Sequence, residues 1–288
     1  MRTKIGLLAL FLATQAAHAD STPDPYHELE TRYLFGFTEG ADIGAQGEQA
    51  VEFETTTQGG RRGGVYGALD QEIEYENVPT QNFSYELSAH TLGYHVRGVP
   101  GSTDATGVNF SGLSTELRYL VIGRGPGSPV GFTLAVSPEW ARRDDFGQRV
   151  TDFSNTFKAV ADAELIANRL YGAINLIYTP DVARSPGQAW ARTSSLGASA
   201  ALAYRVAPKV TLGAEAEIDG AYDGLLAQSW AGDAVFVGPT LHVQFTGKIM
   251  LAASWEAQVA GRASGDRHGL DLVDFPHQRG NLKVEFEF

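Results

Sequence analysis

The last eight residues of the chain are Asn281-Leu282-Lys283-Val284-Glu285-Phe286-Glu287-Phe288. In this stretch the apolar residues alternate with polar ones, which is the period of a β-strand that has one apolar and one polar face. A strand at the end of a chain leaves an unpaired edge, and a closed barrel removes that edge. By itself the stretch predicts either the closing strand of a barrel or the edge strand of a soluble sandwich.

The start of the chain has the three-part pattern of a secretory signal peptide. Arg2 and Lys4 precede an apolar stretch at residues 5–13, and Ala17-His18-Ala19 forms an Ala-x-Ala cleavage site. The apolar stretch is shorter than the roughly 20 residues that a transmembrane helix needs. We therefore predict that residues 1–19 are removed on export and that the mature protein begins at Asp20.

Composition narrows the class of protein further. The mean hydropathy of -0.16 and the lack of a later long apolar run argue against a helical membrane protein, whereas a barrel with a polar lumen is compatible with both. The chain has no cysteine, so disulfides cannot stabilise it. Loss of Arg2 and Lys4 with the signal peptide changes the formal charge from -12 to -14. So acidic a chain is not expected to bind nucleic acid, nor to be held on anionic lipid as a peripheral protein.

Residues 20–47 are the least regular part of the mature chain. Ser21-Thr22-Pro23-Asp24-Pro25 is rich in turn-forming residues, and residues 26–37 could form a short amphipathic helix or an additional strand. We interpret residues 20–47 as a lead-in that lies in the periplasm or is tucked into the lumen. Residues 48–288 are expected to form one barrel, because no domain boundary interrupts them.

From Glu48 onward, the alternating pattern recurs about twelve times, in segments of about ten residues, the length that a tilted membrane-spanning strand needs. An even number of strands is also the rule for bacterial single-chain barrels. The predicted strands are 49–56, 64–76, one from 83, one ending near 122, 132–143, 157–167, 169–178, 196–206, 210–219, 235–245, 249–259 and 281–288.

The connections between these strands alternate in length. Those after the even-numbered strands are short, whereas those after the third, fifth, seventh, ninth and eleventh are longer and polar: 97–107, 144–152, 179–194, 222–232 and 261–279. Short periplasmic turns and long outer loops are the layout of outer-membrane barrels, and a soluble sandwich gives no reason for it. We therefore predict an all-β fold, a single antiparallel transmembrane β-barrel of about 12 strands that the strand ending in Phe288 closes.

Aromatic residues cluster near the predicted periplasmic ends of the strands, as a membrane-interface girdle would. Tyr178 would belong to the opposite girdle. The periplasmic set is Tyr75, Phe83, Tyr85, Tyr119, Phe132, Tyr204, Phe245, Phe286 and Phe288.

The polar face of these strands is strongly acidic, and in a barrel it faces the lumen. A ring of carboxylates in a wall of low dielectric constant concentrates cations and repels anions. A packed network of ion pairs that plugs the barrel would use the same residues. The candidate lumen-lining residues are Glu52, Glu54, Asp70, Glu72, Glu74, Glu86, Glu116, Arg118, Glu139, Arg143, Arg205, Glu215, Glu217 and Glu256.

Catalytic and metal-binding patterns are weak. Asp266 and His268 in the last long loop resemble the acid and histidine pairs of outer-membrane proteases, but no companion acidic pair is evident on another loop. His90 and His95 fall on opposite strand faces and cannot bind one metal ion together. We predict no catalytic residue, no cofactor and no metal site.

The segments 37–44, Gly47-Glu48 and 67–75 carry a family resemblance. They resemble an uncharacterised family of proteobacterial outer-membrane β-barrels, similar to the transporter-like group labelled as phenol-degradation (meta-pathway) outer-membrane proteins. The terminal Phe288 likewise resembles the assembly signal of such barrels. The resemblance implies an outer-membrane barrel that passes small organic molecules, and it assigns no catalytic or binding residue.

Together these patterns predict an outer-membrane protein that acts as a passive pore or uptake channel for small solutes, with an acidic, cation-favouring lumen. The expected partners are outer-membrane lipid and lipopolysaccharide, the solutes, and the barrel-assembly machinery at the C-terminal strand. Two alternatives stay open: a barrel hydrolase with its site in the extracellular loops, and a structural barrel with a blocked lumen.

Overall fold

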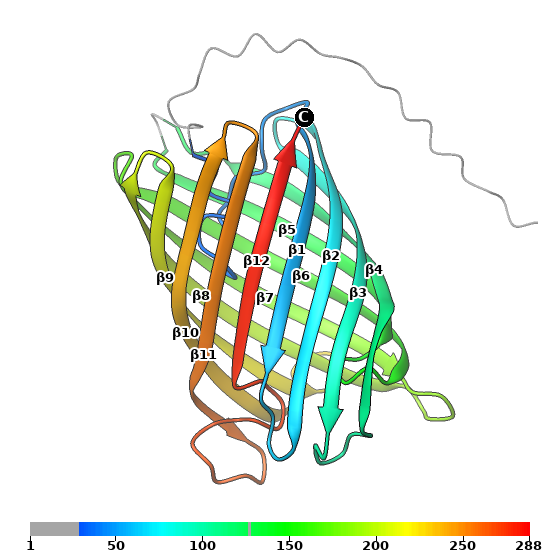
Figure 1. Cartoon of the computed structure of the whole chain (residues 1–288). Coiled ribbons are helices and arrows are strands. Elements are labelled where there is room, and N and C mark those ends of the chain that lie inside the picture. Colours follow the sequence, from blue (N-terminus) through cyan, green and yellow to red (C-terminus); the bar gives the residue numbers. More distant parts are fainter. Residues whose placement is uncertain (1–28, 126–127) are drawn as a thin grey trace, which may run out of the picture.

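The computed structural model describes residues 29–125 and 128–288, and it consists of strands (Figure 1). The predicted signal peptide at residues 1–19 lies outside the described residues. Within them, no helix is long and apolar enough to cross a membrane. The strands are β1 (Gln49–Gly59), β2 (Val65–Thr80), β3 (Phe83–Arg97), β4 (Ala105–Ile122), β5 (Val130–Arg143), β6 (Arg149–Ile166), β7 (Leu170–Arg184), β8 (Ala191–Ala207), β9 (Val210–Asp223), β10 (Ser229–Thr246), β11 (Ile249–Ala263) and β12 (Gln278–Glu287).

The strands form one closed antiparallel barrel in which each strand pairs with its neighbours in the sequence and β12 pairs with β1. At the closure, Val51 lies opposite Phe286, and the rings of Phe53 and Phe286 meet edge to face on the outer surface. No strand edge is left open, so every strand finds backbone partners on both sides. The predicted fold class, including closure by the C-terminal strand, is confirmed.

The outer surface of the barrel carries an apolar band. Exposed large apolar side chains recur on every strand, among them Phe53, Ile73, Leu117, Leu176 and Ile218. The residues between them in sequence face the interior and are mostly polar, because successive side chains of a strand point to opposite faces. An apolar band around a closed barrel with a polar interior is what a lipid bilayer requires.

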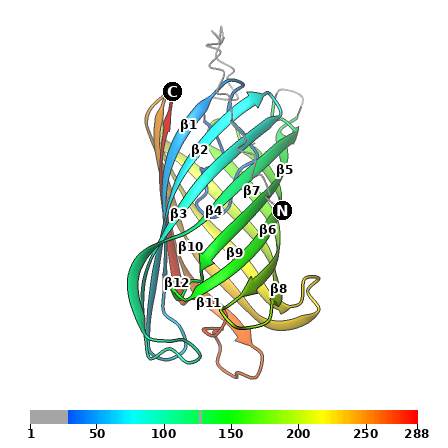
Figure 2. The ribbon, with the colours of Figure 1, turned by 90° about the vertical axis from the view of Figure 1, so that its right-hand side faces the viewer.

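The two ends of the barrel differ (Figure 2). The C-terminus lies at the end that also carries the connections 81–82, 123–129, 167–169, 208–209 and 247–248, which have two or three residues except for 123–129. At the other end lie connections of five residues or more: 60–64, 98–104, 144–148, 185–190, 224–228 and 264–277. Following the layout of outer-membrane barrels, we name the first the periplasmic end and the second the extracellular end.

Several predicted boundaries are wrong, because the strands are longer than the alternation suggested. β6 begins at Arg149, β7 runs to Arg184 and β10 begins at Ser229, so parts of the predicted loops 144–152, 179–194 and 222–232 are paired strand. Beyond the bilayer, both faces of a strand meet water or loops, and the apolar–polar contrast that marks a strand disappears. Backbone pairing continues there without that contrast.

The lead-in also differs from the helix or strand predicted for residues 26–37. Within the described part, residues 29–48 form turns, and one isolated bridge joins Phe35 and Thr38. This segment enters the barrel from the periplasmic end, folds back inside it and returns to the start of β1 (Figure 1). Its backbone groups find partners on the barrel wall instead of in a helix.

Candidate functional site: the barrel lumen

Residues 29–44, named here the N-terminal plug, occupy the periplasmic part of the lumen. Leu34, Phe35 and Ile43 are fully buried. Leu29, Leu34 and Phe35 pack against small and aromatic side chains on the inner wall of β7 and β8, among them Tyr171 and Ala203. The alanines of this part of the wall leave the space that the plug fills.

The first polar anchor of the plug is Arg32. Its guanidinium pairs with Glu76 at 2.6 Å, with Glu86, and with Glu116 at 3.5 Å, so one cation meets carboxylates from β2, β3 and β4. Only 2% of the Arg32 side chain is exposed. Burial lowers the pKa of Arg32, but the carboxylates, Glu76 foremost, raise it more, and the net shift is well upward. Arg32 therefore stays charged inside the barrel.

The second anchor is Glu39, which pairs with Arg118 of β4 and Lys158 of β6. Its backbone is held as well: Glu39 N donates to Asn175 Oδ1 at 2.7 Å, and Asn175 Nδ2 donates to Glu39 O at 2.8 Å. Burial raises the pKa of Glu39, but the cations of Lys158 and Arg118 outweigh that effect and lower it to about 2. Glu39 is thus ionised in the plugged state at any physiological pH.

Backbone N–H groups of the plug also bind carboxylates of the wall. Phe37 N and Thr38 N donate to the two oxygens of Glu215, at 3.1 and 2.7 Å, and Ala41 N donates to Asp162 at 3.1 Å. Thr38 Oγ1 donates to Ser199 Oγ at 3.0 Å. Part of the acidic wall therefore satisfies the backbone of a non-helical segment, which would otherwise be buried without partners.

Two further clusters of ion pairs link strands of the barrel wall to one another. Arg279 of β12 pairs with Glu217 at 2.6 Å, Asp219 at 3.3 Å and Glu256 at 2.6 Å. Its guanidinium also lies over the ring of Phe37 of the plug, 4.6 Å from the centroid. A second cluster joins Lys283 to Glu52 and Glu54, each at 2.9 Å, and the Tyr33 hydroxyl of the plug donates to Glu52 at 2.7 Å.

Beyond the plug, toward the extracellular end, another group of acids surrounds His90. Its Nδ1 lies 3.3 Å from Asp70, and its Nε2 lies 3.6 Å from Glu72 and 2.9 Å from Ser114 Oγ. Glu139 of β5 is close enough to act on His90 electrostatically. We name Asp70, Glu72, His90 and Glu139 the vestibule cluster.

The extracellular end is narrowed by loops that fold inward. Phe146 of the 144–148 loop packs on Tyr66, with ring centroids 5.1 Å apart, and the Arg61 guanidinium lies over both rings. In the 264–277 loop, Asp271 is fully buried, and its carbonyl accepts a hydrogen bond from Gln258 Nε2 at 2.9 Å. The lumen is therefore filled at one end by the plug and narrowed at the other by loops.

The structure divides the sequence-predicted lumen residues among these groups. Arg205 lies apart, because its guanidinium donates to the carbonyl of Pro208 in a periplasmic turn at 2.6 and 3.0 Å. Arg143 lies at the extracellular rim, where it donates to Gly147 O and Asn109. Around the plug and its neighbouring clusters lie Glu52, Glu54, Glu86, Glu116, Arg118, Glu215, Glu217 and Glu256; Glu74 accepts from Ser88, and Asp70, Glu72 and Glu139 lie in the vestibule cluster.

Sequence reasoning missed the residues that organise the site. Arg32 and Glu39 lie in an irregular segment. It has no periodicity from which the direction of their side chains could be predicted. The predicted loop 261–279 includes Arg279, although this residue shares the inward phase of Asn281 and Lys283. β12 begins at Gln278, so Arg279 belongs to the strand and faces the lumen.

The loop considered for catalysis has a structural role in this geometry. Asp266 pairs with Arg62 at 2.7 Å and also with His268, whose side chain is 71% exposed. The hydrogen bond from His268 lowers the pKa of Asp266. These contacts join the 264–277 loop to the connection between β1 and β2.

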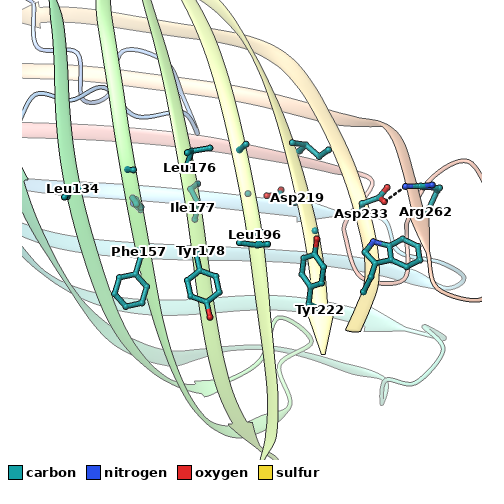
Figure 3. Close-up of a pocket in the computed structure, with 17 residues that line it drawn as sticks. Leu134, Phe157, Leu176, Ile177, Tyr178, Leu196, Asp219, Tyr222, Asp233 and Arg262 are labelled. Carbon is teal, nitrogen blue, oxygen red and sulfur yellow. Dashed lines mark hydrogen bonds and ion pairs between the residues drawn. The ribbon is translucent and has the colours of Figure 1, made fainter. Parts of the chain in front are cut away.

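A hollow of about 820 Å³ lies on the outer wall across β5 to β11, and Figure 3 shows its lining. Most of the side chains point outward and are apolar; Phe157 and Tyr178 stack with centroids 6.1 Å apart. At its edge, Arg262 pairs with Asp233 at 2.9 Å and lies over the ring of Trp230. We interpret this hollow as part of the lipid-facing surface.

The Arg279 cluster yields a stability prediction. Replacing Arg279 by Met leaves Glu217, Asp219 and Glu256 without their shared cation, and breaking such a buried group costs about 3–5 kcal/mol. We expect this loss in the free energy of unfolding, measured by urea titration in detergent micelles. Arg262→Met is the control, because the Arg262 side chain is 75% exposed and its loss should not change the urea midpoint measurably. Equal midpoints for the two variants would contradict the prediction.

Comparisons with known proteins agree with this architecture. The model of DUF6662, a family of unknown function, matches residues 27–288. The barrel is similar to an outer-membrane channel from Pseudomonas putida F1, with a TM-score of 0.56 and 14% identity over 86% of this chain and 98% of that one. It is also similar to the translocator domain of the autotransporter NalP from Neisseria meningitidis, with a TM-score of 0.50 and 12% identity over 86% and 91%. Among curated proteins, no sequence matches. At these identities the similarity is one of fold.

Proposed function

The chain belongs to DUF6662, a family of unknown function, and we propose that it is an outer-membrane channel for small solutes that the N-terminal plug closes from the periplasmic side. The similarity to the Pseudomonas channel supports this proposal at the level of the fold. The apolar outer band supports a location in the outer membrane, with outer-membrane lipid and the barrel-assembly machinery as partners.

The observation that carries the proposal is the chemistry between the plug and the wall. Glu39 and Arg32 bind the wall through ion pairs, and Glu215 binds the plug through two backbone N–H groups. Water can replace polar contacts of this kind when the plug leaves, and the apolar packing of the plug lies mainly on the side of the wall around Tyr171 and Ala203. The plug is continuous with the barrel only through the start of β1, so it can leave without unfolding a strand.

The vestibule cluster supports a proposal for the class of solute. Its three carboxylates face one imidazole, so the path carries negative charge above the plug and favours cations or neutral molecules. We propose a cation-favouring path on this basis. The resemblance to phenol-degradation outer-membrane proteins, with its small organic solutes, stays a prediction.

A reversal potential tests the charge of the path. We would refold the barrel without residues 29–44, insert it in a planar bilayer and apply a salt gradient. The expected reversal potential has the sign of cation selectivity, and Asp70→Asn with Glu72→Gln and Glu139→Gln should move it toward zero.

Glu164→Gln near the periplasmic end is a control that removes one charge outside the vestibule cluster and should leave the reversal potential nearly unchanged. An anion-selective current, or no current from a barrel that is folded by its heat-modifiable migration on a gel, would contradict the proposed function.

A further inference from the structure

A basic groove lies on the extracellular rim of this acidic protein. It has a volume of about 730 Å³, and Trp140, Arg142, Arg149, Thr151, Arg184 and Gln188 line it. These residues come from the extracellular ends of β5, β6 and β7 and from the connection that follows β7. Among the described residues, the lining includes three arginines and no aspartate or glutamate.

The arginines of the groove have no acidic partner. Arg142 and Arg149 form no ion pair among the described residues, and Arg184 lies over the ring of Trp190 at 4.8 Å without one. Elsewhere on the rim, Arg262 pairs with Asp233 and Arg62 with Asp266. Three adjacent unpaired cations repel one another, and an anion bound between them would remove that cost.

The position of the groove indicates where such an anion resides. Trp140 and Phe110 lie on the outer face of β5 and β4, with ring centroids 6.5 Å apart. Phe153 and Trp190 form a second outward pair, at 6.4 Å. Aromatic side chains of this kind mark the interface between hydrocarbon and head groups. The groove is therefore at the level of the lipid head groups, on the side that faces the membrane.

We propose that this groove binds the phosphates of a phosphorylated glycolipid of the outer leaflet, with Arg142, Arg149 and Arg184 as the phosphate ligands. Planar guanidinium groups bind phosphate oxygens in pairs of hydrogen bonds, and basic pockets at a membrane surface recognise anionic head groups in this way. The acyl chains would then lie along the apolar wall below Trp140 and Phe153. The site goes beyond the proposed channel and holds whether or not the lumen conducts.

Native mass spectrometry of the refolded barrel tests the site, with bisphosphorylated lipid A as the probe. Each arginine that contacts the anionic head group in the groove should contribute about fivefold to binding, so Arg142→Gln with Arg149→Gln and Arg184→Gln should weaken binding roughly a hundredfold. The matched control removes three other exposed arginines of the same end, Arg97, Arg192 and Arg262, and should bind as the wild type does.

Two further probes separate the sources of phosphate. Lipid A without its phosphates should bind the wild type as weakly as the charged form binds the triple variant. Inorganic pyrophosphate should fail to displace bound lipid A at equal concentration. Displacement would indicate a site for free anions, and equal loss in the triple variant and its control would indicate attraction by charge alone; either result would overturn the proposal.

Discussion

A chain that lacks residues 29–44 is expected to pass a steady current at least ~10 times that of the intact chain, because the plug fills the periplasmic part of the lumen and its removal leaves a water-filled path. Much of the wall that it contacts is polar, with Asn175, Ser199 and Glu215 among its partners. Such a wall is hydrated readily once the plug is absent. Single-channel recording in planar bilayers measures the difference directly.

An engineered disulfide provides the control for this deletion. The chain has no cysteine, and Thr38 Oγ1 lies 3.0 Å from Ser199 Oγ, so Thr38→Cys with Ser199→Cys can join plug and wall. The oxidised form should keep the low current of the intact chain, even in urea concentrations that release the plug of the wild type. A deletion variant that is folded but conducts no more than the wild type would show that the loops, or a collapsed lumen, block the path.

Glu39→Gln is the second change with a large expected effect. It keeps the shape of the side chain but removes the charge that Lys158 and Arg118 share, so two buried cations lose a partner. We expect plug docking to weaken by about 3 kcal/mol, which corresponds to roughly a hundredfold larger population of the open state. Glu116 keeps contact with both cations and limits the loss. The open probability in single-channel records measures this change in the population of the open state.

The pKa of Glu39 makes the same effect depend on pH. In the docked plug this pKa is lowered to about 2, against 4.5 for a free glutamate. A carboxylate with a lowered pKa stabilises the docked state above pH 4.5 and loses that contribution as the pH falls toward 2. The difference in open probability between wild type and Glu39→Gln should therefore be full at pH 5 to 7 and shrink between pH 4.5 and 2. A difference that grows on acidification would contradict this origin.

The same deletion and point variants separate the alternatives for function. A structural barrel with a blocked lumen predicts low current from every folded variant. A hydrolase with its site in the 264–277 loop predicts an activity that depends on Asp266 and His268 and is independent of the plug. Neither alternative predicts that Glu39 and Arg32, which lie far from that loop in the sequence, control the current.

Strand number and closure could be predicted because they depend on local patterns. The alternation in β9 and β12 is clear, since one face meets lipid and the other meets polar groups along the whole strand. Where that contrast ends, as at Arg149 or Arg184, the boundary was predicted wrongly. The polar residues there are compatible with a loop and with a strand outside the membrane.

The acidic inner face could also be anticipated, but its partners could not. The period of two indicates which side Glu116 or Glu215 faces, and it contains no information on what lies opposite. Arg32 meets Glu76, Glu86 and Glu116 only because the barrel curves three strands around one point of the lumen. The basic groove has the same origin, since Arg142, Arg149 and Arg184 are adjacent through strand pairing alone.

The closed antiparallel barrel follows from the residue pattern alone, because alternation is a property of neighbouring residues and lipid contact imposes it on every strand. That residues 29–44 fill the lumen depends on contacts within the folded barrel. That segment has no regular secondary structure of its own, and its backbone and charges are satisfied by side chains from most of the wall. Contacts of that kind form only after the barrel has closed, so they cannot be predicted from any local sequence pattern.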